Sequence, residues 1–287
     1  MASIQPRKVP YFLTGPGVIF FAALLGAPMV MTLLLSLHSY DFNTGIQPDW
    51  TLANYVEVLG DSYFQKIFGR TFGLALLVTV ICVLIGVPEA YVLSRLSSRW
   101  RSVFLLVVLG PLLISVVVRT LGWALFFGGN GVLTMTAQAL GFGDEPVSLM
   151  FTFTGMTIAL VHVLVPFMVI SVWASLQKID PQSEDAGLSL GASKMTVLRR
   201  ITLPQAMPGI LSGSIIVFAL TASAFATPAI IGGRRMKVVA TAAYDEYLST
   251  LNWPLGATIA ILLLLANIGI IVSYNKLIER RFAKVFE

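Results

Sequence analysis

Six long apolar runs follow one another along the chain, and none of them is interrupted by clustered charge. They lie near residues 12–37, 71–93, 103–127, 151–175, 207–231 and 254–275. An α-helix needs about 20 apolar residues to cross a bilayer. The first run is too long for the apolar part of a secretory signal and has no clear small-residue cleavage site, so we expect a retained helix. The pattern predicts an all-α integral membrane protein with six transmembrane helices.

The composition excludes a soluble globule and a disordered chain. Of the 287 residues, 56% are hydrophobic and 11% are charged, whereas a typical soluble domain is about 25% charged. The net charge of +5 comes from basic residues in short loops rather than from one basic stripe, so we expect no nucleic-acid partner. Cys82 is the sole cysteine, which excludes an intrachain disulfide and a cysteine-based metal site. We expect no metal site in this chain.

The distribution of Lys and Arg predicts the orientation of the spans. Thirteen basic residues lie in the N-terminus, the loops 94–102 and 176–206 and the C-terminal tail, against five in the segments on the opposite side. Loops rich in Lys and Arg stay in the cytoplasm, so both termini are expected there, in a bacterial inner membrane. The outer side is acidic. This excess of acids is either a docking surface or only a solvated face. Its acids are Asp41, Asp49, Glu57, Asp61, Asp144, Glu145, Asp245 and Glu246.

Proline and glycine positions indicate how the spans pack. Prolines inside membrane helices are tolerated where neighbouring helices satisfy the freed carbonyls, which favours a packed bundle. Glycines four residues apart, Gly69 with Gly73 and Gly209 with Gly213, allow close helix contacts. They also agree with the general abundance of glycine in membrane helices. The prolines within the expected spans are Pro28, Pro88, Pro111, Pro166 and Pro228.

The segment between the fourth and fifth expected spans predicts two short helices. Asp180 can cap the first helix at its N-terminus, and Gly191 can take the left-handed conformation that ends it. Ser193 can cap a second helix over 194–201, which should close before Pro204. So short a hairpin cannot bury its apolar residues alone. We therefore expect it to lie against the membrane helices or a cytoplasmic partner.

This segment resembles the EAA loop of type I ABC importer permeases. That loop has the pattern Glu-Ala-Ala, three residues, Gly, nine residues, Ile-x-Leu-Pro, and its departures here are Asp for Glu and Gly for the second Ala, with Glu184 just before. The resemblance implies a coupling helix that docks on a cytoplasmic ATPase, with Asp185 or Glu184 making the charged contact. Gly191 would permit the turn between helices, and the last three motif residues would seat the loop. The matching residues are Asp185, Ala186, Gly187, Gly191, Ile201, Leu203 and Pro204.

Beyond this loop, nearly the whole chain is similar to the spermidine/putrescine-type permeases. Pro111, SVVVRT at 115–120, NGVL at 130–133, LVPFMV at 164–169 and WPLGA at 253–257 carry this resemblance. It implies a permease core over 67–275, preceded by an N-terminal helix and outer loop over 1–66 and followed by a cytoplasmic tail over 276–287.

The resemblance also implies partners. These are a cytoplasmic ABC ATPase dimer, a second and related permease chain, and an extracytoplasmic solute-binding protein. The sequence has no phosphate loop of the Walker type. We therefore expect a non-catalytic subunit that binds no cofactor, with ATP and magnesium on the ATPase.

The expected function is half of the translocation pathway for a small solute, a polyamine or a similar organic ion. Related permeases move iron, thiamine and other small solutes. A spermidine-type permease can carry an aspartate late in the fifth span, where this chain has TPAI at 227–230, which weakens the polyamine assignment. A secondary carrier or channel that needs no ATPase stays open as an alternative.

A match to G-x-S-x-G at 187–191 raises an enzymatic alternative. The nucleophile elbow of hydrolases requires a strand before the serine, and a histidine and an acid elsewhere. The residues before Ser189 predict a helix, and the chain has two histidines, His38 and His162. We reject a hydrolase on these grounds.

Ionisable residues inside membrane spans are functional candidates by default. Glu89 is either a cation-binding carboxylate on the pathway or, as we favour, a side chain that reaches the cytoplasmic interface. Arg119 fits an interfacial anchor or gate contact, because on the path it would repel a polycation. His162 is expected to be a hydrogen-bonded packing residue rather than a proton relay. In the fifth span, three further side chains line the pathway or, as we favour, pack: Phe218, Thr221 and Phe225.

Overall fold

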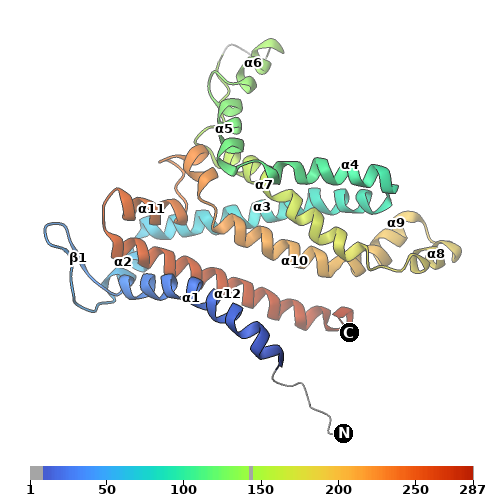
Figure 1. Cartoon of the computed structure of the whole chain (residues 1–287). Helices are drawn as coiled ribbons and strands as arrows, with labels where there is room; N and C mark the ends of the chain where they lie inside the picture. Colours follow the sequence, from blue (N-terminus) through green and yellow to red (C-terminus); the bar gives the residue numbers. More distant parts are fainter. Residues whose placement is uncertain (1–8, 142–144, 287) are drawn as a thin grey trace, which may run out of the picture. The chain divides into compact units, whose positions relative to one another are not determined.

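The protein is almost entirely helical in the computed structural model, which describes residues 9–141 and 145–286 (Figure 1). Long helices form because each backbone amide in lipid must be bonded within its own segment. Arg7, Lys8 and Asp144, used in the topology argument, lie outside the described residues. The elements are α1 (Val9–Ser36), β1 (Tyr40–Asp41), β2 (Gly45–Ile46), α2 (Ala53–Gly60), α3 (Ser62–Arg95), α4 (Ser98–Leu109), η1 (Gly110–Leu113), α5 (Val116–Phe127), α6 (Val132–Ala139), α7 (Phe153–Leu176), α8 (Pro181–Ser189), α9 (Lys194–Val197), η2 (Leu198–Thr202), α10 (Leu203–Ala222), η3 (Pro228–Gly232), α11 (Val239–Leu248) and α12 (Trp253–Phe286).

Six helical stretches within the described residues are long and apolar enough to cross a membrane. This confirms the predicted number. Four of them agree with the expected runs to within a few residues, except that the second starts nine residues earlier. These four are Thr14–Ser36, Ser62–Arg95, Phe153–Leu176 and Trp253–Leu277.

The expected third span, 103–127, is wrong as a single helix. The helical run that starts with α4 ends at Leu113, Ile114 is extended, and α5 begins at Val116. The stretch long enough to cross the membrane is Val116–Ala139 instead. Pro111 has no amide hydrogen, so the helical ladder is already weakened three residues before the break at Ile114.

The expected fifth span, 207–231, also has different bounds. The spanning helix runs from Lys194 to Ala222, and the chain continues irregularly before the π turn η3. The ring of a proline clashes with the helical carbonyl four residues before it. Pro228 therefore disfavours a helix through Ala224, which is where the expected span is interrupted.

The chain packs as two compact units, residues 1–65 with 242–264, and residues 66–241 with 265–287. The first unit thus includes a segment from the end of the chain besides the N-terminal part that we expected over 1–66. Within it, the carbonyl of Ser36 accepts hydrogen bonds from Thr258 and Asn54, both at 3.2 Å. A two-stranded hairpin pairs Tyr40 with Ile46.

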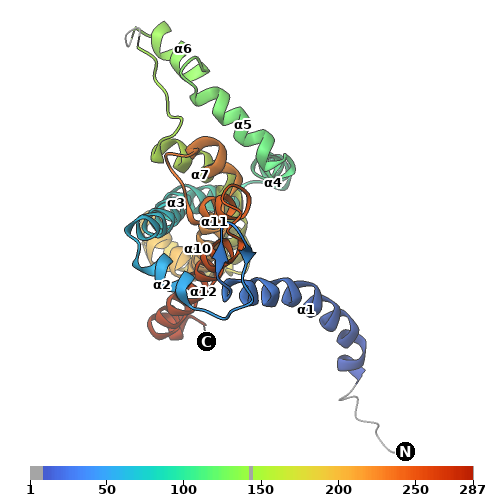
Figure 2. The same cartoon turned by 90° about the vertical axis from the view of Figure 1, so that its left-hand side faces the viewer.

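The core of the second unit lies between α3, α7 and α10, which stay together in both views (Figures 1 and 2). Val78, Val169 and Val217, one from each helix, are fully buried. A Cβ added at Gly209 would lie 2.5 Å from the Ser171 carbonyl oxygen, and one at Gly213 would lie 2.8 Å from Met168 Sδ. This pair of glycines therefore does bring α10 against α7, as small residues do in lipid. Gly69 and Gly73 meet nothing within 4 Å in the described chain.

Candidate functional site

The first helix of the loop, α8, begins and ends as predicted. The Asp180 carboxylate accepts a hydrogen bond from the Gln182 amide at 3.0 Å, which is an N-cap. At the other end, Gly191 has φ +82°. The Ala192 amide donates to the Gly187 carbonyl and the Gly191 amide to that of Leu188, which together form a Schellman cap. Two sharp ends therefore hold α8 to nine residues.

The G-x-S-x-G sequence lies in this same helix and its cap. Ser189 is the last residue of α8, whereas a nucleophile elbow places its serine directly after a strand. The match therefore does not produce the geometry of a hydrolase site.

The second helix differs from its prediction at the C-terminal end. The Ser193 hydroxyl accepts from the Thr196 amide at 3.3 Å and caps α9, as expected. The helix does not close before Pro204, however, because the π turn η2 carries it directly into α10. Pro204 lies in the first turn of α10, where the wider π turn tolerates its missing amide hydrogen.

Two residues of the motif that are 14 positions apart meet in space. A Cβ placed on Gly187 would lie 2.8 Å from Ile201 Cδ1 and 3.2 Å from Val197 Cγ2. The glycine that replaces the second alanine of the family pattern therefore lets α8 lie close against the α9–η2 run. Val197 is buried in this contact. Leu203 and Pro204 begin α10 directly after it.

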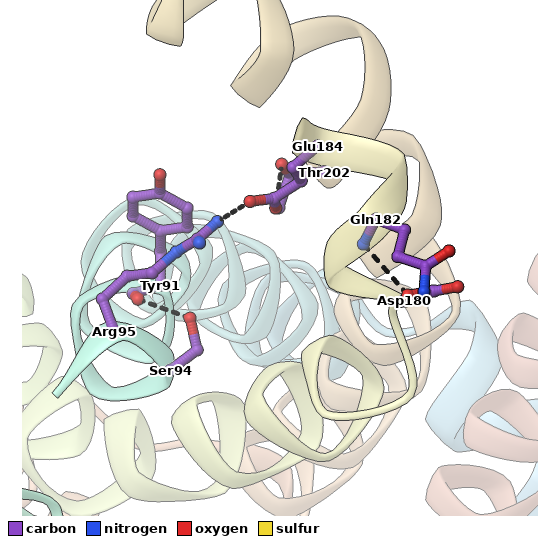
Figure 3. Close-up of polar contacts among 7 residues, drawn as sticks. All are labelled: Tyr91, Ser94, Arg95, Asp180, Gln182, Glu184 and Thr202. Carbon is purple, nitrogen blue, oxygen red and sulfur yellow. Dashed lines mark hydrogen bonds and ion pairs between the residues drawn. The ribbon is translucent and has the colours of Figure 1, made fainter. Parts of the chain in front are cut away.

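Glu184 joins α8 to two other elements, the helix α3 and the π turn η2 (Figure 3). Its Oε2 accepts a hydrogen bond from Arg95 Nη2, in an ion pair with the last residue of α3. Its Oε1 accepts from the Thr202 hydroxyl at 2.8 Å. Glu184 is only 9% exposed, so its carboxylate makes its contacts within the chain.

The pKa of Glu184 reflects this environment. Burial raises the pKa of a carboxyl group, but the hydrogen bonds from Arg95 and Thr202 outweigh burial and lower the pKa of Glu184 below its ordinary value of 4.5. The side chain is therefore a carboxylate at neutral pH.

Asp185, which takes the place of the motif's glutamate, lies differently from its neighbour. It is exposed, because consecutive residues of a helix are about 100° apart around the axis. Ala186 and Leu190 are exposed as well. The loop thus turns one acid inward and presents the other, with an apolar side chain nearby, to its surroundings.

Two of the candidate pathway residues line one cavity. Glu89 of α3 and His162 of α7 are both at a cavity of about 650 Å³ whose other walls are largely apolar. Trp123 of α5 also lines it and donates a hydrogen bond from Nε1 to His162 Nδ1 at 3.2 Å. His162 is therefore hydrogen-bonded but exposed, and Glu89 lies at the wall of the same cavity.

Arg119 holds the break in the expected third span. It is buried, and its Nη1 donates to the Pro111 carbonyl. Its Nε has no hydrogen-bond partner among the described residues. The Pro111 carbonyl, in η1, thus accepts hydrogen bonds from both the guanidinium and the Ile114 amide, so Arg119 makes a contact inside the protein.

The three candidates from the fifth span do not join the Glu89 cavity. Phe218 stacks on Phe72 with ring centres 6.3 Å apart and lines a separate cavity of about 350 Å³. The buried Thr221 hydroxyl donates to the Val217 carbonyl of its own helix, and Phe225 lies beyond the end of α10. The structure therefore does not gather the six pathway candidates into one site.

Sequence reasoning missed Arg95, Thr202 and Trp123. Arg95 was counted only as a cytoplasmic charge, and Thr202 occupies the unspecified position of the Ile-x-Leu-Pro pattern. No local signal pairs Arg95 with Glu184, because 89 residues separate them.

The helices and the loop define a multi-pass membrane protein with a short capped helix, α8, between its fourth and fifth spans. The model of the family described as "Binding-protein-dependent transport system inner membrane component" matches residues 90–284. The chain belongs to this family, and it is a membrane-spanning permease subunit of an ABC importer.

Named relatives agree with this assignment. The spermidine/putrescine transport system permease protein PotB of Haemophilus influenzae is 28% identical, with 96% of each chain covered. PotB of Escherichia coli is 30% identical over 82% of this chain and 86% of its own. The molybdenum transport system permease protein ModB of Mycobacterium bovis is 32% identical over 68% and 71%.

Among solved structures, the fold is similar to that of a chain of a bacterial ABC transporter involved in the import of the acidic polysaccharide alginate. The TM-score is 0.75, with 19% identity and 95% of each chain covered. A chain of the MetNI methionine ABC transporter gives a TM-score of 0.59 at 16% identity, over 77% of this chain and 98% of that one. At such identities the likeness concerns the fold.

Proposed function

We propose that this permease imports a polyamine or a similar small organic cation, driven by separate ATPase subunits. The relatives named for spermidine and putrescine, which cover nearly all of the chain, support this cargo. A relative of similar identity is named for molybdenum, so the binding protein is expected to choose among solutes. Glu89 places a carboxyl group at the wall of its cavity, where its ionised form would attract a cationic solute.

The proposed partners are a cytoplasmic ATPase dimer, a second and related permease, and an extracytoplasmic solute-binding protein. ATP and magnesium belong to the ATPase, and this chain itself catalyses nothing. In this proposal, both termini and the loop 176–206 face the cytoplasm. ATP-driven closure of the ATPase then displaces the loop and reorients the helices around the solute.

The observation that carries this proposal is the arrangement of the loop motif in space. Gly187 packs on Ile201, Gly191 makes the turn, and Asp185 remains exposed beside them. A nine-residue helix with an outward carboxylate is the kind of surface that a charge-assisted contact with another subunit requires. We assign that contact to Asp185 rather than to Glu184, because Glu184 is occupied within the chain.

A crosslink from one added cysteine tests whether this loop contacts the ATPase. The native Cys82 is fully buried, so a thiol reagent should react at an added cysteine. Leu190→Cys, at a position that is 88% exposed beside the turn, should crosslink to an ATPase subunit in membranes that contain the complete transporter. Phe42→Cys, 85% exposed in the hairpin between β1 and β2, is the matched control and should not. Equal capture at both positions, or none at Leu190→Cys, would contradict the proposal.

The cargo is tested with the transporter reconstituted in vesicles. Spermidine or putrescine should enter only when the ATPase, ATP and the binding protein are present, and Glu89→Gln should slow this uptake. Uptake without an ATPase would instead indicate a secondary carrier. Uptake of molybdate, iron or thiamine but not of a polyamine would contradict the proposed cargo. The proposed ATP-driven mechanism would still hold.

A further inference from the structure

We propose that Glu184 is a positioning residue that links α8 to the last turn of α3 and to the first part of the α10 run. The α10 run is the continuous helical stretch Lys194–Ala222, made of α9, η2 and α10. A displacement of the loop would then move two membrane spans together. This inference rests on the proposed function, because it concerns how the same loop passes on the force of the ATPase.

The first argument is that both oxygens of the Glu184 carboxylate are bonded within the chain. Each of its two oxygens accepts a hydrogen bond, one from Arg95 and the other from Thr202, and these donors come from different elements (Figure 3). The side chain is also only 9% exposed, so little of its surface is available for contact with another subunit. Its geometry is that of a link within the chain.

The second argument is that Arg95 is held in place before it meets Glu184. Its guanidinium carbon lies 5.0 Å from the centre of the Tyr91 ring, one helical turn earlier. Such stacking limits the freedom of the long side chain and adds a cation–π contact. Arg95 also ends α3, where a positive charge is favoured by the helix dipole. The position of the guanidinium therefore follows the position of α3.

The third argument is that α8 is already tied to the α10 run on its other side. Thr202 is 2% exposed and is the last residue of the π turn that leads into α10. Gly187 also lies so close to Ile201 and Val197 that an added Cβ would come within 2.8 Å of Ile201 Cδ1, so α8 packs directly on this turn. With that side fixed, the Arg95 pair adds a direct connection from α8 to the end of α3.

The exposure of Arg95 indicates that its ion pair with Glu184 contributes to coupling rather than to folding stability. The Arg95 side chain is 49% exposed, and ion pairs with an exposed partner contribute little to folding stability. Loss of the pair should therefore leave the protein folded in the membrane. What should change is how much solute is moved for each ATP, since α3 would no longer follow the loop.

The test uses the complete transporter in vesicles, with uptake and ATP hydrolysis measured in the same sample. Arg95→Gln and Glu184→Gln should each lower the solute moved per ATP by about three- to tenfold, which lies within the effects known for residues that modulate coupling. Arg95→Lys keeps a donor and a charge and should recover at least half of the loss. Protein levels and copurification with the ATPase should stay at the level of the unmodified chain.

Asp185→Asn is the matched control, because it removes the neighbouring exposed acid. It should weaken copurification with the ATPase, whereas Glu184→Gln should not. The inference is overturned if the Gln variants transport with unchanged solute per ATP, if Arg95→Lys is as impaired as Arg95→Gln, or if Glu184→Gln is the variant that releases the ATPase. If the unmodified transporter shows no ATP-driven uptake at all, the proposed function fails instead.

Discussion

The α10 helical run is held by two contacts of different chemistry. In the membrane-spanning part, Gly209 and Gly213 let its backbone lie directly against α7, and no charge takes part. At its beginning, the side chains of Thr202 and Glu184 tie it to α8, and Arg95 extends the tie to α3. Packing of small residues is the main source of helix association where the solvent is lipid. Charged groups cost less where the chain meets water than in lipid, so the charged link lies in the loop.

We expect the largest effect from a substitution in the membrane-spanning part, at the contact between α10 and α7. Gly209→Leu places a side chain where a Cβ alone would be 2.5 Å from the Ser171 carbonyl oxygen. Overpacking of this kind typically costs about 1–3 kcal/mol, and occasionally more, so the amount of folded protein in the membrane and its melting temperature should fall. Gly69→Leu is the control, because nothing in the described chain lies within 4 Å of a Cβ there. Equal losses in both variants would mean that the Gly209 contact is not special.

The turn of the loop should give an intermediate effect. Gly191 has φ +82°, and no described atom lies within 4 Å of an added Cβ, so a substitution acts through the backbone alone. A left-handed conformation costs an ordinary L-residue roughly 1–2 kcal/mol, whereas asparagine tolerates it. Gly191→Val should therefore reduce ATP-driven uptake at an unchanged protein level, and Gly191→Asn should come close to the unmodified chain. Similar uptake by both variants would show that the left-handed turn has no role in coupling.

The smallest effect concerns pH. The pKa of Glu184 lies below 4.5 because the hydrogen bonds from Arg95 and Thr202 outweigh burial. A lowered pKa in the folded state means that the stabilisation is fully present above the unfolded value and is lost as the pH falls through the folded one. A fluorescent label on Leu190→Cys should thus keep a constant anisotropy from pH 7 down to about 4.5, and become more mobile below. The same label with Glu184→Gln should show no such transition, and loosening well above pH 4.5 would contradict the pKa direction.

The sequence by itself determined what depends on short stretches of chain. The number of spans follows from the length of the apolar runs, since a bilayer sets that length. The ends of α8 follow from Asp180 and Gly191, because a cap acts within one turn of the helix. The N-terminal cap of α9 at Ser193 was predicted for the same reason, whereas the π turn η2 and the passage of the helix through Pro204 were not.

Only the tertiary structure decided what depends on residues far apart in the chain. It paired Arg95 with Glu184 across 89 positions, gave Glu184 and Asp185 opposite surroundings, and brought Glu89 and His162 to one cavity while leaving Phe218 at another. It also separated the glycines that pack, Gly209 and Gly213, from those that meet nothing in the described chain. The physical reason is that helical phase fixes which residues share a face, whereas the packing of the helices decides what that face meets.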